Sequence, residues 1–468
     1  MSRNLQFKDF LLLMLIVALS TLSFVKKARA IPSFSRQTGL SCDVCHTVFP
    51  HLTPFGRDFK LHGYTYDYSK LIKFSRNQYK QQASEEGFLP NLAVNQIPML
   101  SLRVKSQYSH MKGGSNVPST THFNWVKGSS LYFAGEIAPD IGTFTELTGI
   151  DDNGGSLTLG GFDLALVGPN EKLGPYNLTF GLRGEDMVGF SDPTNSVGNW
   201  GALLHGFSGG ISSRNRFFEA FAPSPLEGGE IYAMLGGFTH GGLYAAFGLY
   251  HPTSGQVGET YVALTDPRSA SAKSDTSATF DGTSNVDEYG RLAYFFPGFD
   301  HIYTEIGTFG YFGHENITAS EAPGNGEYSD AVREYGLDGQ LQYIDSHNLF
   351  EIFASFIHDR NGSFYGHDIY NGQLINGSAV AANNFSINAD YYYNRTYGIY
   401  AKYTYQHSSE LKDLNVSGEA VGLSWYPYQN VNLRLEEDVY NKDNPDVAAT
   451  GGSASDYDTT RVMLQYAF

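Results

Sequence analysis

The feature that most constrains this chain is a two-residue hydrophobic period that recurs from about residue 91 onward. One example is the apolar series Phe385, Ile387, Ala389, Tyr391 and Tyr393, whose intervening residues include Ser386, Asn388 and Asp390. The same alternation recurs around 335–343, 397–406 and 431–436. It puts apolar side chains on one face of a strand and polar side chains on the other. In a transmembrane β-barrel the apolar face meets lipid and the polar face lines a wet lumen.

The connections between these segments also follow a pattern. Short turns are expected near 297–300, 345–347, 394–396 and 427–429, and they alternate with long polar segments at about 252–286, 314–331, 360–382 and 441–457. Outer-membrane barrels alternate short periplasmic turns with long external loops in this way. The chain ends on another alternating series, Val462, Leu464, Tyr466 and Phe468, which resembles the terminal strand of outer-membrane proteins. Tyrosines near the strand ends are expected to form aromatic girdles.

These patterns predict an all-β fold, a transmembrane antiparallel β-barrel. Strand counting gives about 16 strands, with about 18 as the alternative, and an even number is required if both ends face the periplasm. The uncertainty lies in residues 190–230, where the glycine-rich stretch Gly206–Gly210 could be strand, bend or inward loop. A soluble all-β secreted protein is the alternative fold, because it gives similar alternation. A helical membrane protein would need runs of about 18 apolar residues, and none follows residue 30.

Residues 1–30 have the features of a secretory signal peptide. Arg3 and Lys8 precede a short apolar core, and Ala28-Arg29-Ala30 provides a small-residue cleavage site. A signal anchor that stays attached is the alternative. Cleavage after Ala30 would change the net charge from −17 to −21. This acidic net charge argues against a nucleic-acid partner, because nucleic-acid binding needs basic patches on the protein. It favours cations and basic redox proteins as partners.

Both cysteines of the chain fall in a single motif, Cys42-Asp43-Val44-Cys45-His46. This is the attachment pattern for c-type haem. Cys42 and Cys45 would form thioether bonds to the vinyl groups of one covalently attached haem c, and His46 would be the proximal ligand of its iron. A thioredoxin-like pair would need a βαβ pattern after the motif, and a zinc site would need further spaced ligands. A simple disulfide between the two thiols is the remaining alternative.

The segment after the motif is predicted to contain a short helix over 54–62. Thr53 and the proline that follows it form a favourable helix start, and Gly63 can end the helix in the left-handed conformation. Phe55 and Phe59 lie four residues apart and therefore share one helical face. That face could contact a haem or the barrel wall. Residues 31–90 are too few to build a good core alone, and a covalent haem would stabilise them.

The second axial ligand of the iron is less constrained by the sequence. His62 has enough chain between it and His46 to reach the opposite haem face, so it is the first candidate. Met99 is the alternative, followed by Met111. His51 is a further candidate, but the stretch of chain between it and His46 is shorter. Each of these residues could equally serve in packing or at the surface, and the sixth position could also be open.

The stretch from Ile31 to His46 resembles the N-terminus of the fused monohaem cytochrome–porins, outer-membrane proteins of iron-oxidising bacteria and their relatives. The shared elements are Arg36-Gln37-Thr38 before the haem motif, then Phe55-Gly56-Arg57 and Phe59-Lys60 after it. The resemblance implies three parts: a signal peptide over 1–30, a monohaem c-type cytochrome segment over 31–90 and a porin-like barrel over 91–468. It further implies that the haem segment lies inside the barrel as a plug.

For function, the resemblance implies an outer-membrane protein that passes electrons from extracellular Fe(II) to periplasmic c-type cytochromes. Its partners would then be outer-membrane lipid, the iron and such a cytochrome. Acidic lumen residues such as Glu334, Asp338 and Glu436 are expected to concentrate cations. The alternatives are a general extracellular electron conduit, or a haem-plugged porin with another donor, and a passive porin with a disulfide. No acid–base dyad, nucleophilic triad or phosphate loop was found, which argues against a hydrolytic enzyme.

Overall fold

The computed structural model describes the N-terminal segment and the strands of one large sheet. The described residues are 32–38, 40–48, 51–65, 99–114, 118–150, 158–186, 191–194, 226–252, 255–256, 278–281, 286–319, 327–364, 378–408, 416–440 and 454–467. The expected signal peptide lies outside them. Three short helices come first: α2 Pro32–Thr38, α3 Cys42–Cys45 and α4 Pro54–Leu61. No helix in these ranges is long and apolar enough to cross a membrane.

Within the described residues, 20 strands form a single sheet. They are β1 Leu100–Met111, β2 Thr120–Asn124, β3 Ser129–Ala138, β4 Ile141–Ile150, β5 Thr158–Val167, β6 Glu171–Leu173, β7 Tyr176–Glu185, β8 Leu226–Gly237, β9 His240–Pro252, β10 Gly255–Gln256, β11 Ala278–Asp281, β12 Asp287–Pro297, β13 Ile302–Ala319, β14 Glu327–Ile344, β15 Asn348–Phe364, β16 Ser378–Tyr393, β17 Tyr397–Ser408, β18 Val416–Tyr428, β19 Val431–Tyr440 and β20 Thr459–Ala467. A 3-10 helix, Ala454–Tyr457, precedes β20.

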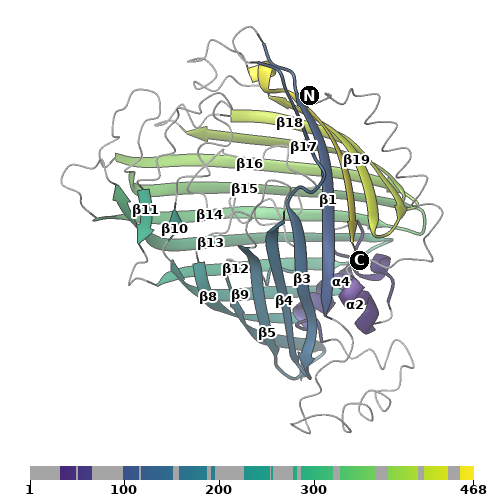
Figure 1. Cartoon of the computed structure of the whole chain (residues 1–468). Helices are drawn as coiled ribbons and strands as arrows, with labels where there is room; N and C mark the ends of the chain where they lie inside the picture. Colours follow the sequence, from purple (N-terminus) through teal and green to yellow (C-terminus); the bar gives the residue numbers. More distant parts are fainter. Residues whose placement is uncertain are drawn as a thin grey trace.

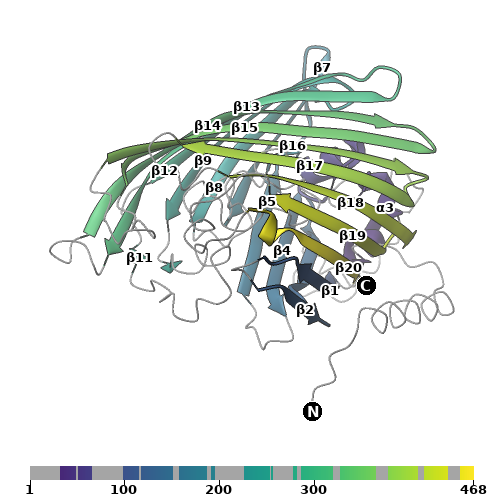
Figure 2. The same cartoon turned by 90° about the horizontal axis from the view of Figure 1, so that it is seen from above.

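These strands form a closed antiparallel barrel (Figures 1 and 2). The pairs β2/β3, β5/β6, β9/β10 and β11/β12 are each consecutive pieces of one barrel strand, so the described chain makes 16 barrel strands. Closure comes from β1, which pairs with β20 from Arg103↔Ala467 to Met111↔Thr459 and with β2 and β3 on its other side. The prediction of 16 strands is confirmed. Because the barrel is closed, no strand edge is left unpaired, and an unpaired edge could otherwise pair with another chain and aggregate.

The two faces of the wall have opposite polarity. On β14, Tyr335 and Leu337 point outward and are 50% and 59% exposed, whereas Glu334 and Asp338 point inward and are buried. The same arrangement holds on β13, where Ile306 is exposed and Glu305 is buried. A soluble barrel would bury the apolar face, so the soluble alternative is wrong. An apolar exterior around a polar interior is the arrangement of outer-membrane barrels.

The short turns are confirmed near the predicted positions, at 298–301, 345–347, 394–396 and 429–430. The long connections are shorter than expected, because β13 and β14 each have 18 residues and continue to Ala319 and from Glu327. The sequence of 314–331 shows no clear two-residue alternation, so the pattern did not reveal these strand extensions. Gly206–Gly210 lies outside the described residues.

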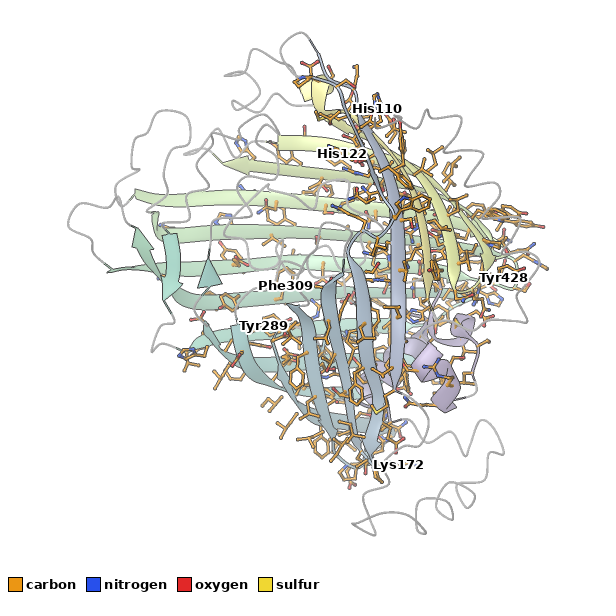
Figure 3. The ribbon with its side chains drawn as sticks, viewed as in Figure 1. His110, His122, Lys172, Tyr289, Phe309 and Tyr428 are labelled. Carbon is orange, nitrogen blue, oxygen red and sulfur yellow. The ribbon has the colours of Figure 1, made fainter. Side chains whose placement is uncertain are left out.

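Exposed aromatic side chains gather beside the short turns. Phe299 is 78% exposed in the β12–β13 turn, and Tyr176, Tyr393 and Tyr397 flank neighbouring turns with exposed rings. Such a ring of aromatic residues marks one membrane–water interface. In Figure 3, Lys172 lies at this end of the barrel. The expectation of an aromatic girdle is therefore confirmed at the short-turn end.

The N-terminal helices lie inside the mouth of the barrel at the short-turn end (Figures 1 and 2). Their side chains and carbonyls bond to the inner wall: Gln37 donates to the Ala134 carbonyl at 3.0 Å, and Tyr232 donates to the Leu61 carbonyl at 2.5 Å. A second segment, residues 191–194, also reaches this region, because Lys60 donates to the Asp192 carbonyl at 2.8 Å. Part of the long β7–β8 connection therefore folds inward onto the helices.

We expect a charge on the outer wall to destabilise the barrel according to its depth. Leu337→Arg places a cation in the middle of the apolar band, which costs about 2–4 kcal/mol, whereas Phe299→Arg in the turn costs about 0–1 kcal/mol. The measurement is the free energy of unfolding in lipid vesicles. Equal costs for the two variants would contradict the assignment of the outer face to lipid.

Candidate haem-binding site

The cysteine motif forms a single tight turn. Helix α3 spans Cys42–Cys45, and its last turn is closed by the His46 N–H, which donates to the Cys42 carbonyl at 2.8 Å. His46 itself leaves the helix in an extended conformation, with φ −115° and ψ 135°. Cys42 and Cys45 are not joined in a disulfide. The turn thus brings both thiols and the following imidazole into one short stretch of backbone.

The orientation of His46 suits an iron ligand. Its Nδ1 lies 3.2 Å from the His51 carbonyl oxygen, and the backbones of His46 and Leu52 form an antiparallel bridge. An Nδ1–H that donates to a backbone carbonyl leaves the lone pair on Nε2, which is the usual state of a histidine that binds a metal. The residues at the motif therefore fit a covalently attached haem, with Cys42 and Cys45 as the thioether positions.

Helix α4 packs directly on the motif. The Thr53 N–H donates to the Cys45 carbonyl at 2.9 Å, and the Thr53 hydroxyl donates to the Val44 carbonyl at 2.6 Å. The same hydroxyl caps α4 by accepting from the Gly56 N–H at 3.0 Å. A Cβ at Gly56 would collide with the Cys45 carbonyl, so only glycine allows this approach. The predicted helix is confirmed as Pro54–Leu61, and Gly63 follows it at φ +59°.

Two turns of the barrel hold the motif from outside. Arg395, in the β16–β17 turn, donates to the Asp43 carbonyl at 2.6 Å. Gln429, in the β18–β19 turn, accepts from the Cys42 N–H at 3.4 Å. Val48, in the loop after His46, packs in a buried cluster with Leu349, Tyr392 and Tyr426 of the wall. The motif therefore has a fixed position at the short-turn end.

The Cys45 thiol is set back from solvent. Its burial, together with the charges of Cys42 and Asp43, raises the pKa of the Cys45 thiol to about 12. At neutral pH this thiol is therefore protonated in the folded chain, and a protonated thiol is a poor nucleophile. The Cys45 thiol is therefore less reactive in the seated segment than it is in an unfolded chain.

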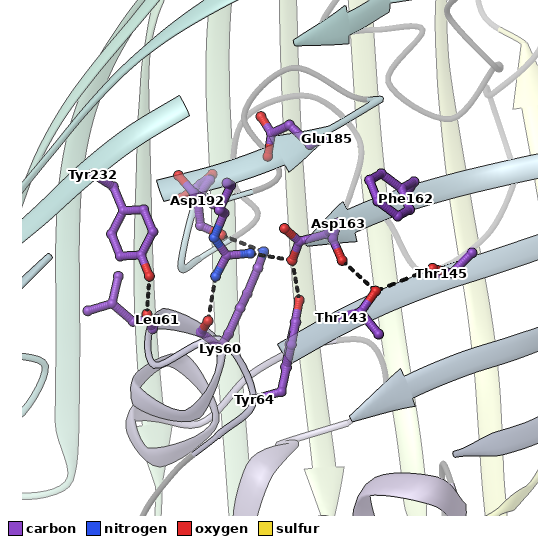
Figure 4. A network of polar contacts seen from close by, with 12 residues as sticks. Lys60, Leu61, Tyr64, Thr143, Thr145, Phe162, Asp163, Glu185, Asp192 and Tyr232 are labelled. Atoms are coloured by element: carbon purple, nitrogen blue, oxygen red, sulfur yellow. Dashed lines mark hydrogen bonds and ion pairs between the residues drawn. The ribbon is translucent and has the colours of Figure 1, made fainter. Parts of the chain in front are cut away.

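On the opposite side, α4 is held by a polar network on β5, β7 and β8 (Figure 4). Arg183 forms a fully buried ion pair with Asp163 and also donates to the Lys60 carbonyl. The Tyr64 hydroxyl donates to the same Asp163 carboxylate at 3.1 Å. Such a buried pair contributes to stability only while both partners remain, because either charge alone would be uncompensated. The arrangement fixes the end of α4 against the wall.

The structure separates the candidates for the second iron ligand. His62 Nδ1 lies 2.8 Å from the Asp58 carbonyl oxygen, and its Nε2 lies 3.2 Å from Asn170 Oδ1, so the ring turns toward the β5–β6 connection. Met99 immediately precedes β1, and its carbonyl accepts from the Ala134 N–H at 3.0 Å. Met111 ends β1, roughly 36 Å from the start of that 12-residue strand, too far to reach the motif.

His51 is the histidine that the structure places beside the motif. Its carbonyl contacts His46, its ring is buried, and its Nδ1 lies 2.7 Å from Glu351 Oε2. A carboxylate on one imidazole nitrogen is a common way to orient a histidine in a metal site. No local sequence pattern indicated this contact, because Glu351 lies 300 positions away on β15.

Sequence reasoning also missed the arginines of the lumen. Asp338 forms a bidentate ion pair with Arg291, and Glu436 pairs with Arg461 at 3.2 Å. Glu334, Asp338 and Glu436 point inward as expected. Asp338 and Glu436 are nevertheless engaged by arginines, so the expectation that such acidic residues concentrate cations needs correction for these two. Alternation identifies the inward face, but not the pairing across strands.

The chain was compared with known proteins. No protein-family model matches it, and no curated protein matches it. Solved structures that resemble it include a loop-deletion mutant of OmpT from Vibrio cholerae, with 11% identity over 79% of this chain and 98% of that one at a TM-score of 0.41. Salmonella typhi OmpF in complex with daunomycin has 11% identity over 79% of this chain and 97% of that one, at a TM-score of 0.41. An anion-selective porin from Comamonas acidovorans has 11% identity over 79% of this chain and 98% of that one, at a TM-score of 0.42.

We expect Gly56→Ala to disturb the motif. The added Cβ meets the Cys45 carbonyl, so α4 must shift, at a cost of about 1–3 kcal/mol. A matched control is Gly290→Ala on β12, where an added Cβ meets nothing within 4 Å. The measurements are the unfolding free energy and the yield of covalent haem in cells that mature c-type cytochromes. Equal values for the two variants would contradict the close packing of α4 on the motif.

Proposed function

We propose that this chain is an outer-membrane c-type cytochrome fused to a porin-like barrel, which carries electrons from extracellular Fe(II) to a periplasmic c-type cytochrome. The observation that supports it best is the pose of His46 directly after the two cysteines, where its Nδ1 lies 3.2 Å from the His51 carbonyl oxygen, a contact that orients histidines in metal sites. When bound, a c-type haem supplies reversible one-electron transfer. The described residues hold that group in place and shape its surroundings.

The position of the motif supports a role across the membrane. Short turns of outer-membrane barrels face the periplasm, and the motif is anchored to two such turns through Arg395 and Gln429. A haem attached there would lie within reach of a periplasmic partner. The long connections at the other end face the cell exterior, from which a donor would enter.

The surroundings of the motif also bear on its redox potential. Burial and nearby charge set the potential of a haem. Val48, Leu349 and Tyr392 provide an apolar wall near the motif, and the buried contact between His51 and Glu351 lies beside it.

A second candidate is a haem-plugged conduit with another donor, or with electrons that flow outward. The polar contacts that hold the helices in the barrel mouth are compatible with this candidate, because none of them selects a particular electron donor. A passive porin with a disulfide is less well supported, because Cys42 and Cys45 are not paired with each other.

The first test is an anaerobic visible spectrum of the detergent-solubilised full chain, made in cells that mature c-type cytochromes. We expect a covalent c-type spectrum that changes to the reduced form on addition of iron(II) at neutral pH. Reduction by dithionite but not by iron(II) would favour the second candidate. A chain without covalent haem would overturn both and leave the passive porin.

Two histidine variants test the iron ligands. We expect His46→Ala to lose the low-spin spectrum or the haem itself, because the proximal ligand is removed. The matched control His62→Ala should keep the spectrum, since both nitrogens of that ring already contact Asp58 and Asn170. A spectral change in His62→Ala would show instead that His62 is the second axial ligand.

A further inference from the structure

Two buried carboxylates face each other across neighbouring strands of the lumen wall. Glu351 on β15 is directly opposite Asp390 on β16 in the antiparallel register. Both side chains point inward, and they are 0% and 2% exposed. Side chains in such pairs have Cβ atoms about 4.5–5.5 Å apart, and like charges placed this way repel each other.

The two carboxylates differ in their partners. Glu351 is engaged on both oxygens: its Oε2 lies 2.7 Å from His51 Nδ1, and its Oε1 accepts from the Gln342 amide. Asp390 has no hydrogen-bond partner on either oxygen among the described residues. A buried carboxylate without partners is strongly disfavoured, so a compensating group is expected at this point.

The protein supplies only part of that compensation. The cations that act on Asp390 are His51, when protonated, and Arg434 of β19. Arg434 is already engaged by the Tyr426 hydroxyl, to which it donates at 2.9 Å. The two oxygens of Asp390 therefore stay available beside Glu351, whose direction is fixed by His51 and Gln342.

We propose that Asp390 and Glu351 form a binding site for a divalent cation on the lumen wall beside the haem motif. Hard divalent cations prefer carboxylate oxygens and often keep several waters, so two carboxylates can suffice.

The site connects to the motif through one residue. His51 holds Glu351 with its ring and His46 with its carbonyl, so a cation on the two carboxylates lies one residue away from the proposed iron ligand. The inference goes beyond the proposed function, because cation binding here requires neither haem nor electron transfer. If the proposed function is correct, this is the place where an iron(II) donor would bind.

The test is a titration of the detergent-solubilised full chain with Mn²⁺, which electron paramagnetic resonance counts as free and bound ion. We expect Asp390→Asn, which keeps the shape but removes the charge, to weaken Mn²⁺ binding at least about tenfold. The matched control is Glu230→Gln on β8, because Glu230 is likewise a buried lumen carboxylate, 1% exposed, and lies on a different strand from Asp390 and Glu351. That control should bind Mn²⁺ like the unchanged chain.

Each result has a definite meaning. Equal weakening in the two variants would show general attraction by lumen charge and would overturn the site, as would unchanged binding in Asp390→Asn. The heat-dependent gel mobility of the barrel verifies that each variant is folded. A second variant, Glu351→Gln, removes the charge of the other carboxylate and should also weaken Mn²⁺ binding. Loss of Mn²⁺ binding with a normal iron-dependent spectrum would leave the proposed function standing. Retained Mn²⁺ binding without iron-dependent haem reduction would leave the cation site standing alone.

Discussion

The polarity of the wall is the constraint on which the rest of the structure depends. Lipid requires apolar side chains outside, so residues such as Leu337 and Ile306 face outward and the polar half of each strand must face inward. The interior then cannot hold a segment by apolar packing alone. It holds the N-terminal segment through hydrogen bonds and ion pairs centred on the buried Arg183–Asp163 pair, together with two apolar clusters around Leu61 and Val48.

The attachment of the N-terminal segment to the inner wall also explains the tight packing around the cysteine motif. The carbonyl of Cys45 is covered by α4, and Thr53 links the end of one helix to the start of the next. Gly56 is required because the two backbones touch. A segment of this size has little core of its own, so the wall and the bonds within the segment supply its rigidity.

Much of the fold could be predicted from the sequence because a barrel repeats one simple pattern. Alternation identified the inward and outward faces, and the helix from Pro54 was indicated by its cap at Thr53 and its end at Gly63. The pairings across the lumen could not be predicted. The contact between His51 and Glu351 depends on strand register and on where the helices sit, and neither has a local signal. The ends of β13 and β14 were also missed, because the sequence there has no clear two-residue alternation.

The anchors of the motif have a consequence for biogenesis. Asp43 and Cys42 are bonded to Arg395 and Gln429, which lie 352 and 387 positions later in the chain. These contacts join the first part of the exported polypeptide to some of its last hairpins, so they are among the slowest to form. Docking of the N-terminal segment is therefore a late event of folding, which follows the formation of the hairpins that carry Arg395 and Gln429.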